Sequence, residues 1–474
     1  MSAAPSAAQA RVPGSIVAAF SAPGLPLAGL VLVFGVYLPR FYVGKGLDFL
    51  AVAGAILAVR ALDIWLDPFL GLAMDRTRTP IGRYRPWLVA GAPIAMLGVW
   101  RLLAPSGPVD TAYLILWLLV AYAGASMLNL GVAAWGASLA TTYHERSRLY
   151  GWTQGLAVLG AIGLAMLPLV THGAVVLGKA ASMPTVGMIL VVAIPMAVVI
   201  CALFTPERIV AAGRPRFSPS DYWSAISRPT MWRIIVADLA LTLGPGTTAP
   251  LYVYFFHDAK GFNIAEVGFL LIFYIAAGLV GAPTWGRLAR RIGKPRTIQI
   301  ACVSYGVAQT VLMVLPRVWP GHRLIDTLPT VAGMFAVGFC ASAFLLLIRA
   351  MVADVVDEVR LERGQDLTSL LFSMVTTTTK IGTVITLVIA FPILKLVGYN
   401  GKEGAVNSAG AIFGLEMCYL FAPIALVFVG GALFFGYRLD ARRHAEIRAA
   451  LEARDEGHAF AAGEESLVGM VAEE

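Results

Sequence analysis

The sequence predicts an all-α membrane protein with twelve transmembrane helices in two six-helix pseudo-symmetric bundles. Of the 474 residues, 58% are hydrophobic and only 14% are charged, and the mean hydropathy of +0.76 is outside the range of soluble domains. Apolar stretches of about 20 residues, the length an α-helix needs to cross a bilayer, recur along the chain. We expect twelve spans, near residues 16–43, 48–74, 87–105, 111–140, 150–171, 184–205, 231–256, 265–286, 297–316, 328–352, 368–398 and 409–437.

The basic residues lie mainly in the loops after the second, fourth, sixth and eighth spans. They do not form one soluble face, so the formal net charge of +8 does not indicate a nucleic-acid partner. The positive-inside rule places these loops, and with them both termini, in the cytoplasm. The N-terminal stretch MSAAPSAAQARVPG lacks the ordered regions of a cleavable signal peptide, so we expect the first span to be retained.

No motif in the chain indicates an enzyme. The sequence contains no HExxH motif and no nucleophile with a matching base among the spans. The cysteines Cys201, Cys302, Cys340 and Cys418 lie inside expected spans without CxxC spacing, so buried packing is favoured over a disulfide or a structural metal site. We expect no cofactor.

An internal repeat divides the chain. The segment DPFLGLAMDRTRTPIGRYRP in the first half matches APTWGRLARRIGKPRT in the second, so that Pro68, Gly71, Asp75 and Arg76 correspond to Pro283, Gly286, Arg290 and Arg291. We expect the repeated glycines to let helices approach closely. The expected domains are an N-terminal bundle (1–205) with the cation site, a cytoplasmic middle loop (206–230), a C-terminal bundle (231–437) and a cytoplasmic tail (438–474).

Two acids stand one helical turn apart inside the second span. Asp63 and Asp67 share a helix face, although one charge at the bilayer centre costs roughly 2.5 to 3.5 kcal/mol. Two carboxylates in a desolvated site favour holding a proton or a cation between them. The pair is therefore a candidate coupling-ion site; the alternative is a passive salt bridge to a neighbouring helix.

Lys380 in the eleventh span is the candidate partner of these acids, because an unpaired ammonium there would be as costly. The alternative is a lysine that extends to the cytoplasmic interface. Threonines 376–379 could ligate an ion or bond to their own backbone. On the fourth span, Ser126 and Asn129 could complete a cation shell or bond to other helices.

The motif RALDIWLDP…DRT…GRYRPW, the segment YHERSRL, the segment ADVVDEV and the lysine in the eleventh span together resemble the glycoside–pentoside–hexuronide (GPH):cation symporter family, the family of melibiose permease. The resemblance implies the fold of the major facilitator superfamily, with a substrate site between the halves. It assigns coupling-ion binding to Asp63 and Asp67, and it matches Lys380, Thr376 and Ser126 to family positions. It also implies a gate at the cytoplasmic side, where Asp354 and Asp357 pair with the loop that holds Arg146 and Arg148 when the inside is closed. The full gating set is Gly71, Asp75, Arg76, Arg83, Arg146, Arg148, Asp354 and Asp357.

The chain also departs from that family. Leu66 replaces an asparagine that helps to hold the metal ion, which favours H⁺ over Na⁺ without excluding Na⁺. Ala28, Asn129, Ala133 and Gln154 replace the polar and aromatic positions of the galactoside site, which argues against a galactoside. The candidate cavity residues are Tyr37, Arg40, Asn129, Trp152, Gln154, Asp238 and Tyr254. Arg40 is expected to face either an anionic group or the outer lipid headgroups.

The sequence therefore predicts a secondary-active symporter that couples H⁺ or Na⁺ to a small solute of the sugar or glycoside type. We expect a multi-pass protein of the bacterial inner membrane that binds a small-molecule substrate and is surrounded by lipid, with a monomer as the family default. Two alternatives remain open: cation-coupled transport of an amphiphile such as a lysophospholipid, and a non-transporting membrane sensor.

Overall fold

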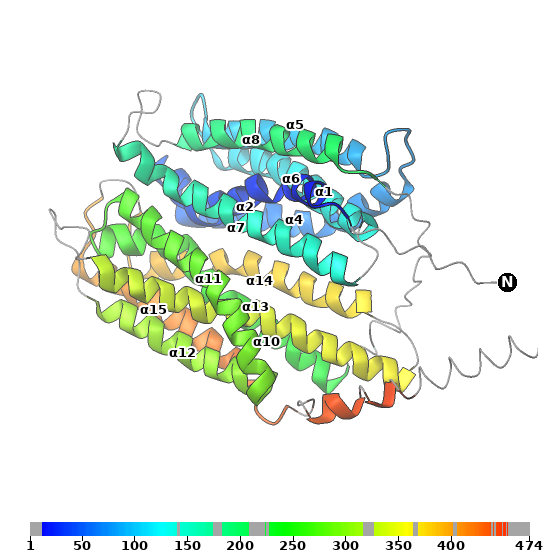
Figure 1. The fold of residues 1–474 in the computed structure, drawn as a ribbon. Coiled ribbons are helices and arrows are strands. Elements are labelled where there is room, and N and C mark those ends of the chain that lie inside the picture. Colours follow the sequence, from blue (N-terminus) through cyan, green and yellow to red (C-terminus); the bar gives the residue numbers. More distant parts are fainter. Residues whose placement is uncertain are drawn as a thin grey trace, which may run out of the picture.

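The computed structural model describes residues 12–139, 143–173, 183–207, 223, 227–315, 327–363, 368–401 and 405–437, and after these residues 439, 442–447, 449–451 and 453. Among them, twelve helical segments are long and apolar enough to cross a membrane. The predicted twelve-span all-α architecture is confirmed. Figure 1 shows the helices of the N-terminal half, α1 to α8, above those of the C-terminal half, α10 to α15.

The first six spans form the N-terminal half. The first span consists of α1 (Gly14–Ser21), α2 (Gly24–Leu32), the π-helical segment η1 (Val33–Tyr37) and α3 (Leu38–Gly44). The next five spans are α4 (Phe49–Arg76), α5 (Arg85–Leu103), α6 (Thr111–Leu139), α7 (Tyr143–Gly173) and α8 (Met183–Phe204).

The last six spans form the C-terminal half. Its first span is α10 (Pro229–Tyr254), which continues as the π-helical segment η2 (Phe255–Ala259). The others are α11 (Ile264–Ile292), α12 (Lys294–Val314), α13 (Leu328–Arg363), α14 (Thr368–Leu396) and α15 (Ala409–Ala432). Helices α7, α11 and α13 extend beyond the expected spans because their charged ends continue the helix past the apolar stretch that hydropathy detects.

The two ends of the bundle differ in charge. One end, called the basic end below, carries the turn 77–84 between α4 and α5, the turn between α11 and α12 at Gly293, and the start of α10. The turns 45–48, 104–110 and 260–263 and the described residues 397–401 and 405–408 lie at the opposite end. The chain crosses between these ends with every span, so a residue's place along its helix gives its depth.

Both halves begin with a span that changes from α to π geometry near the opposite end. Segment η1 does so in the first span and η2 in the seventh. Wide π turns within α-helices frequently occur at functional sites. Here they bring Arg40, which follows η1, and Asp258, which lies in η2, to the same depth.

The repeated glycines do not serve close helix packing as expected. A Cβ added at Gly71 would meet nothing within 4 Å, and one at Gly286 would make only an ordinary contact at 3.9 Å. Close approaches lie at other glycines, for example between α5 and α6, where a Cβ at Gly98 or Gly124 would come within 2.5 Å or 2.3 Å of the facing backbone. Small residues are needed there because two helix backbones meet directly.

Candidate functional site

Two acids of one half and an amine of the other meet midway along their helices. Asp63 and Asp67 project from α4, and Lys380 projects from α14. The ammonium of Lys380 contacts Asp67 Oδ2 and lies 3.9 Å from Asp63 Oδ2. Lys380 thus lies against the acids and does not extend to the membrane interface, because a charge inside the bilayer is costly unless it is paired.

Ser126 of α6 completes one side of this cluster. Its hydroxyl donates a 2.5 Å hydrogen bond to Asp63 Oδ1, and both side chains are buried. Asp67 Oδ1 is also buried, but it has no hydrogen-bond partner among the described residues. The cluster therefore holds one amine and keeps one carboxylate oxygen unused, which is an arrangement that can accept another positive ligand at the position of the ammonium.

Two further residues predicted for the ion site do not reach it. Asn129 Nδ2 donates to the carbonyl of Ala125 at 2.9 Å, and Thr376 Oγ1 donates to the carbonyl of Phe372 at 2.9 Å. Both bonds stay within the residue's own helix, which is the common behaviour of polar side chains on membrane helices.

Asp238, predicted for the substrate cavity, is buried between helices of its own half. Thr379, which directly precedes Lys380, lies 2.9 Å from Asp238 Oδ2 and donates a hydrogen bond to it. Asp238 is only 2% exposed. It therefore stands beside the helix that carries the lysine and does not face an open space.

Arg60 and Tyr122 are neighbours of the acids that the sequence interpretation missed. Arg60 Nε donates to the hydroxyl of Tyr122 at 2.9 Å, and the guanidinium lies 5.6 Å from the centre of that ring. Arg60 precedes Asp63 by three residues and so lies close to its helix face. The signal that could have identified Arg60 was a basic residue inside an apolar span, one helical turn before Asp63.

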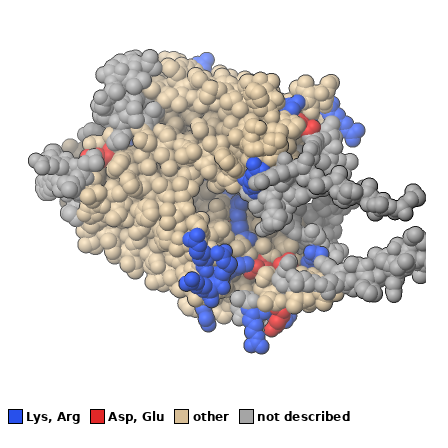
Figure 2. Space-filling view, viewed as in Figure 1, with Lys and Arg blue, Asp and Glu red and all other residues tan. Residues whose placement is uncertain are grey.

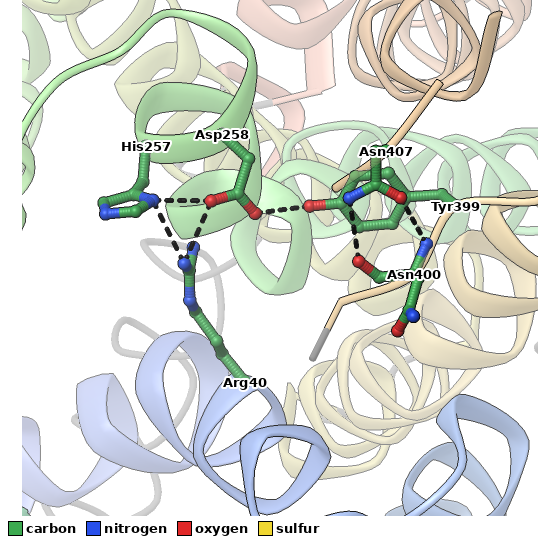
Figure 3. Close-up of polar contacts among 6 residues, drawn as sticks. All are labelled: Arg40, His257, Asp258, Tyr399, Asn400 and Asn407. Carbon is green, nitrogen blue, oxygen red and sulfur yellow. Dashed lines mark hydrogen bonds and ion pairs between the residues drawn. The ribbon is translucent and has the colours of Figure 1, made fainter. Parts of the chain in front are cut away.

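A second polar cluster joins the halves near the opposite end (Figure 3). Arg40 Nη2 donates to Asp258 Oδ1 at 3.0 Å and lies 3.2 Å from His257 Nδ1. His257 Nδ1 also lies 2.5 Å from Asp258 Oδ1, and the hydroxyl of Tyr399 donates to Asp258 Oδ2. Burial, followed by the nearby Asp258 carboxylate, raises the pKa of Tyr399, so this hydroxyl keeps its proton and acts as a donor. Of the two partners expected for Arg40, the structure provides an anionic group.

Aromatic rings close the interface beside this cluster. The guanidinium of Arg40 lies 5.0 Å from the centre of the Tyr254 ring. Phe49 of α4 packs edge-on against Tyr254 at 5.8 Å and against Phe391 at 5.1 Å. The hydroxyls of Tyr254 and of the predicted cavity residue Tyr37 are buried and have no hydrogen-bond partner among the described residues.

An exposed ion pair also joins the halves at the opposite end. Lys395 Nζ lies 3.2 Å from Asp48 Oδ2, and both side chains are more than half exposed. Between residues that the structure describes, every hydrogen bond and ion pair joining the two halves lies at mid-depth or at the opposite end. Figure 2 shows the surface hollowed between the halves, with a basic side chain visible inside the hollow.

The predicted gate residues at the basic end make contacts within their own halves. Asp354 accepts from Lys294 at 2.5 Å, and Asp357 lies 3.1 Å from His444. Arg148 donates to the carbonyl of Val12 at 2.9 Å. The expected pairing of Asp354 and Asp357 with the loop that holds Arg146 and Arg148 stays a prediction, because the side chain of Arg146 lies outside the described part of the structure.

The other predicted gating and cavity residues occupy varied positions. Arg83 Nε donates to the carbonyl of Met74 at 3.2 Å, while Arg76 is exposed and Gly71 is half-buried. Trp152 and Gln154 are exposed on α7. The side chains of Asp75 and Arg146 lie outside the described part of the structure.

A capping carboxylate, which was not expected, fixes the turn between α4 and α5. Glu207, after α8, accepts hydrogen bonds from the backbone amides of Arg83 at 2.5 Å and Tyr84 at 2.8 Å. An acid at a helix N-terminus is stabilised by the helix dipole. Glu207 thereby ties the basic turn of the first repeat to the end of the sixth span.

Comparisons with known proteins match this architecture. A model of the family described as MFS/sugar transport protein matches residues 19–441. An isoprimeverose transporter of Lactiplantibacillus pentosus is 28% identical over 426 residues, covering 85% of this chain and 84% of the relative. The sodium-dependent lysophosphatidylcholine symporter 1 of Homo sapiens is 25% identical over 446 residues, covering 85% and 79%.

Solved structures show the same fold. The crystal structure of the nucleoside transporter NupG superimposes with a TM-score of 0.66 at 12% sequence identity, covering 89% of this chain and 99% of that chain. At this identity the likeness concerns the arrangement of helices alone.

Proposed function

Since the chain belongs to the MFS/sugar transport protein family, we propose that it is a secondary-active symporter that couples H⁺ or Na⁺ to uptake of a small solute of the sugar or glycoside type. Membership of this family makes it a transporter, and its twelve apolar helices agree with a multi-pass membrane protein. The observation that supports coupling is the contact of Lys380 with Asp67, in which an amine of one half occupies the place where two acids of the other half would hold a cation.

The proposed mechanism is alternating access controlled by this charge cluster. With Lys380 against the acids, the amine compensates the charge of one carboxylate, which lowers the cost of a conformational change of the empty carrier. A proton or a metal cation at Asp63 and Asp67 displaces the ammonium, and movement of the halves around bound solute follows. Closure around solute without the cation would bury unpaired charge, and each 1.4 kcal/mol of that cost suppresses leak about tenfold.

The coupling particle is constrained by the oxygen atoms at the site. Among the described side chains, the printed contacts of the cluster involve the oxygens of two carboxylates and of the Ser126 hydroxyl, and the Leu66 side chain offers none. A proton requires only a carboxylate, whereas a metal ion requires a shell of several oxygen ligands. This supply of ligands favours H⁺, and the relative named as sodium-dependent keeps Na⁺ as the second candidate.

We place the basic end in the cytoplasm by the positive-inside rule, which puts both termini there. With the opposite end held by Arg40, Asp258 and the aromatic rings around Tyr254, the structure corresponds to an inward-facing state. The solute would be released toward the basic end, where no hydrogen bond or ion pair between described residues joins the halves.

The substrate class rests on the relatives. Those named for sugars or glycosides include the isoprimeverose transporter and a putative glycoside/cation symporter of Escherichia coli. The alternative is an amphiphile, which the relatives named for lysophosphatidylcholine support. Ala28 and Ala133, small and apolar where the resemblance expects an acid and a ring, also suit an acyl chain.

The test is uptake by proteoliposomes that contain the purified full chain. A panel of radiolabelled pentosides, hexosides, hexuronides and lysophospholipids is offered under an imposed pH gradient and, separately, an imposed Na⁺ gradient. Accumulation of a glycoside driven by one gradient supports the proposal, and accumulation of a lysophospholipid alone selects the alternative. Absence of accumulation in every arm, with the protein shown to be folded, contradicts symport.

A further inference from the structure

Arg349 is a basic residue inside the apolar span formed by α13. Its side chain is exposed, and its guanidinium makes no hydrogen bond or ion pair with another residue that the structure describes. An ionised group at this depth is costly unless it meets a partner or a water-filled space, and such groups frequently mark the path of a substrate. Arg349 is therefore a candidate binding residue outside the cluster of Lys380 and its acids.

The side chain of Arg349 lies on the side of α13 that faces α10 and α14. Its charge acts on the carboxylate of Asp238 in α10, and this carboxylate accepts a hydrogen bond from Thr379 of α14 at 2.9 Å. Phe344, five residues before Arg349, packs instead against Tyr305 of α12, with the ring centres 5.7 Å apart. Because an α-helix turns by about 100° per residue, the side chains of Phe344 and Arg349 leave α13 in directions about 140° apart. The guanidinium thus points away from α12 and toward α10 and α14.

The two helices that Arg349 approaches border the N-terminal half. Helix α14 carries Lys380, which contacts Asp67 of α4, and α10 packs against η1. The surface is hollowed between the halves (Figure 2). The exposed guanidinium of Arg349 therefore faces this hollow, beside the coupling cluster.

A guanidinium binds an anion better than it binds a neutral hydroxyl. It has five N–H donors in a planar fork that matches both oxygens of a carboxylate, and it stays charged at physiological pH. The nearby Asp238 leaves these donors unused, because its described hydrogen bond comes from Thr379. An anionic group in the hollow can occupy them.

We propose that Arg349 binds the anionic group of the transported solute, and that this solute is an acidic glycoside, a sugar derivative that bears a carboxylate. This inference rests on the proposed function, because it takes the molecule bound in the hollow to be the solute of a symporter. The balance of charge supports it, since one coupling cation adds a positive charge to the interface and one anionic solute cancels it. The loaded carrier then has the same total charge as the empty carrier, so it buries no additional charge when its conformation changes.

The test measures binding to the purified full-length protein in lipid nanodiscs, by calorimetric titration. The probes are two matched pairs, methyl glucuronide with methyl glucoside and methyl galacturonide with methyl galactoside. The members of a pair differ only in a carboxylate in place of a hydroxymethyl group. At about pH 6 with Na⁺ present, either coupling particle is available and the carboxylate of the probe stays ionised.

We define the acid preference as the dissociation constant of the neutral probe divided by that of its acidic partner. In at least one pair we expect the unaltered protein to prefer the acid by about ten- to a hundredfold, the range for hydrogen bonds to a charged group. Arg349→Gln should abolish this preference by weakening the acidic probe alone. Arg349→Lys keeps the charge without the planar fork and should retain part of the preference.

Two further variants separate binding from other roles of the charge. Asp238→Asn removes the carboxylate that competes with the probe for Arg349, while the asparagine still accepts the hydrogen bond from Thr379. This variant should raise the acid preference about twofold or more. Arg296→Gln is the matched control, because Arg296 is exposed at the start of α12, at the basic end, and its loss should leave the preference unchanged.

No acid preference in either pair would overturn the proposal. An equal loss for both members of a pair in Arg349→Gln would also overturn it, because it would show that Arg349 only supports the fold. So would the same loss of preference in Arg296→Gln. If Arg349→Gln does not fold, an unchanged preference in Asp238→Asn decides against the proposal. None of these results bears on symport, since the measurement contains no transport step, and the uptake assay tests symport independently.

Discussion

Lys380 and Asp67 contact each other across the interface between the two halves, although 313 residues separate them in sequence. Because the pair crosses the interface, the charge at Asp67 in the N-terminal half affects how the C-terminal half, which carries Lys380, is held against it. Any ligand that changes the charge at Asp67 therefore changes the free-energy difference between the conformations.

The first prediction concerns Asp67. We expect Asp67→Asn to abolish concentrative uptake while leaving downhill exchange of solute, because the neutral amide cannot take part in the exchange of cation for lysine. Uptake and counterflow in proteoliposomes measure the two activities. Asp110→Asn is the control, since Asp110 is exposed and asparagine also accepts the hydrogen bond from the Tyr113 amide. Unchanged accumulation in Asp67→Asn would remove Asp67 from coupling.

The second prediction concerns the amine. Lys380→Gln leaves two acids without their partner, and removing one member of a buried pair costs about 3 to 5 kcal/mol. Because the lysine side chain is 39% exposed, we expect the lower end of this range. The melting temperature should fall and should be restored by the coupling cation or by low pH.

A matched lysine provides the control for this measurement. Lys395→Gln breaks the exposed pair with Asp48, and such pairs contribute about 0 to 1 kcal/mol. Equal losses of stability in the two variants would show that the Lys380 pair is no more than a surface contact.

The third prediction concerns Ser126. Ser126→Ala removes the hydrogen bond to Asp63, and a hydrogen bond to a charged group contributes about 1.5 to 3 kcal/mol. If the coupling particle binds at these acids, its half-saturating concentration in uptake should change by roughly tenfold or more. Ser126→Thr retains a hydroxyl and should restore most of the unaltered value. The same half-saturation in all three proteins would place the ion elsewhere.

The fourth prediction concerns Arg40 and Asp258. Asp258→Asn weakens closure of the opposite end, so spin labels at exposed Lys45 and Val406 should report a larger open fraction there. Arg40→Gln should act in the same direction, and the double variant should show less than the sum of the two effects. For two residues in contact, a coupling of about 0.5 to 3 kcal/mol is typical. Full additivity would mean that the two side chains do not act on closure together.

The sequence sufficed for those features that follow from the cost of charge in a membrane. Asp63, Asp67 and Lys380 stand in apolar spans, and an unpaired charge there is so unfavourable that a partner could be expected far along the chain. The twelve spans were predictable for a similar reason, since each needs a minimum apolar length. The roles assigned to these three residues remain predictions.

Features near the ends of the spans were harder to predict. Arg40 could have reached the headgroups as readily as a partner, and no pattern indicated that η1 and η2 would bring it to Asp258. Asn129 was expected at the ion site because it offers a neutral oxygen in the fourth span, yet its amide bonds to its own helix. Among the described residues, no helix approaches closely at the repeated Gly71 and Gly286. A shared motif reports common ancestry without specifying the packing distance.

The separation of Asp67 from Lys380 also has a consequence for biogenesis. At about 5 to 20 residues per second of synthesis, the 313 positions from Asp67 to Lys380 take roughly 15 to 60 s to translate. During that interval the helix that carries Asp67 has been synthesised, while Lys380, its partner, has not. The acids of the second span therefore lack this partner until the eleventh span is made, and the contact between Lys380 and Asp67 forms only after both halves are present.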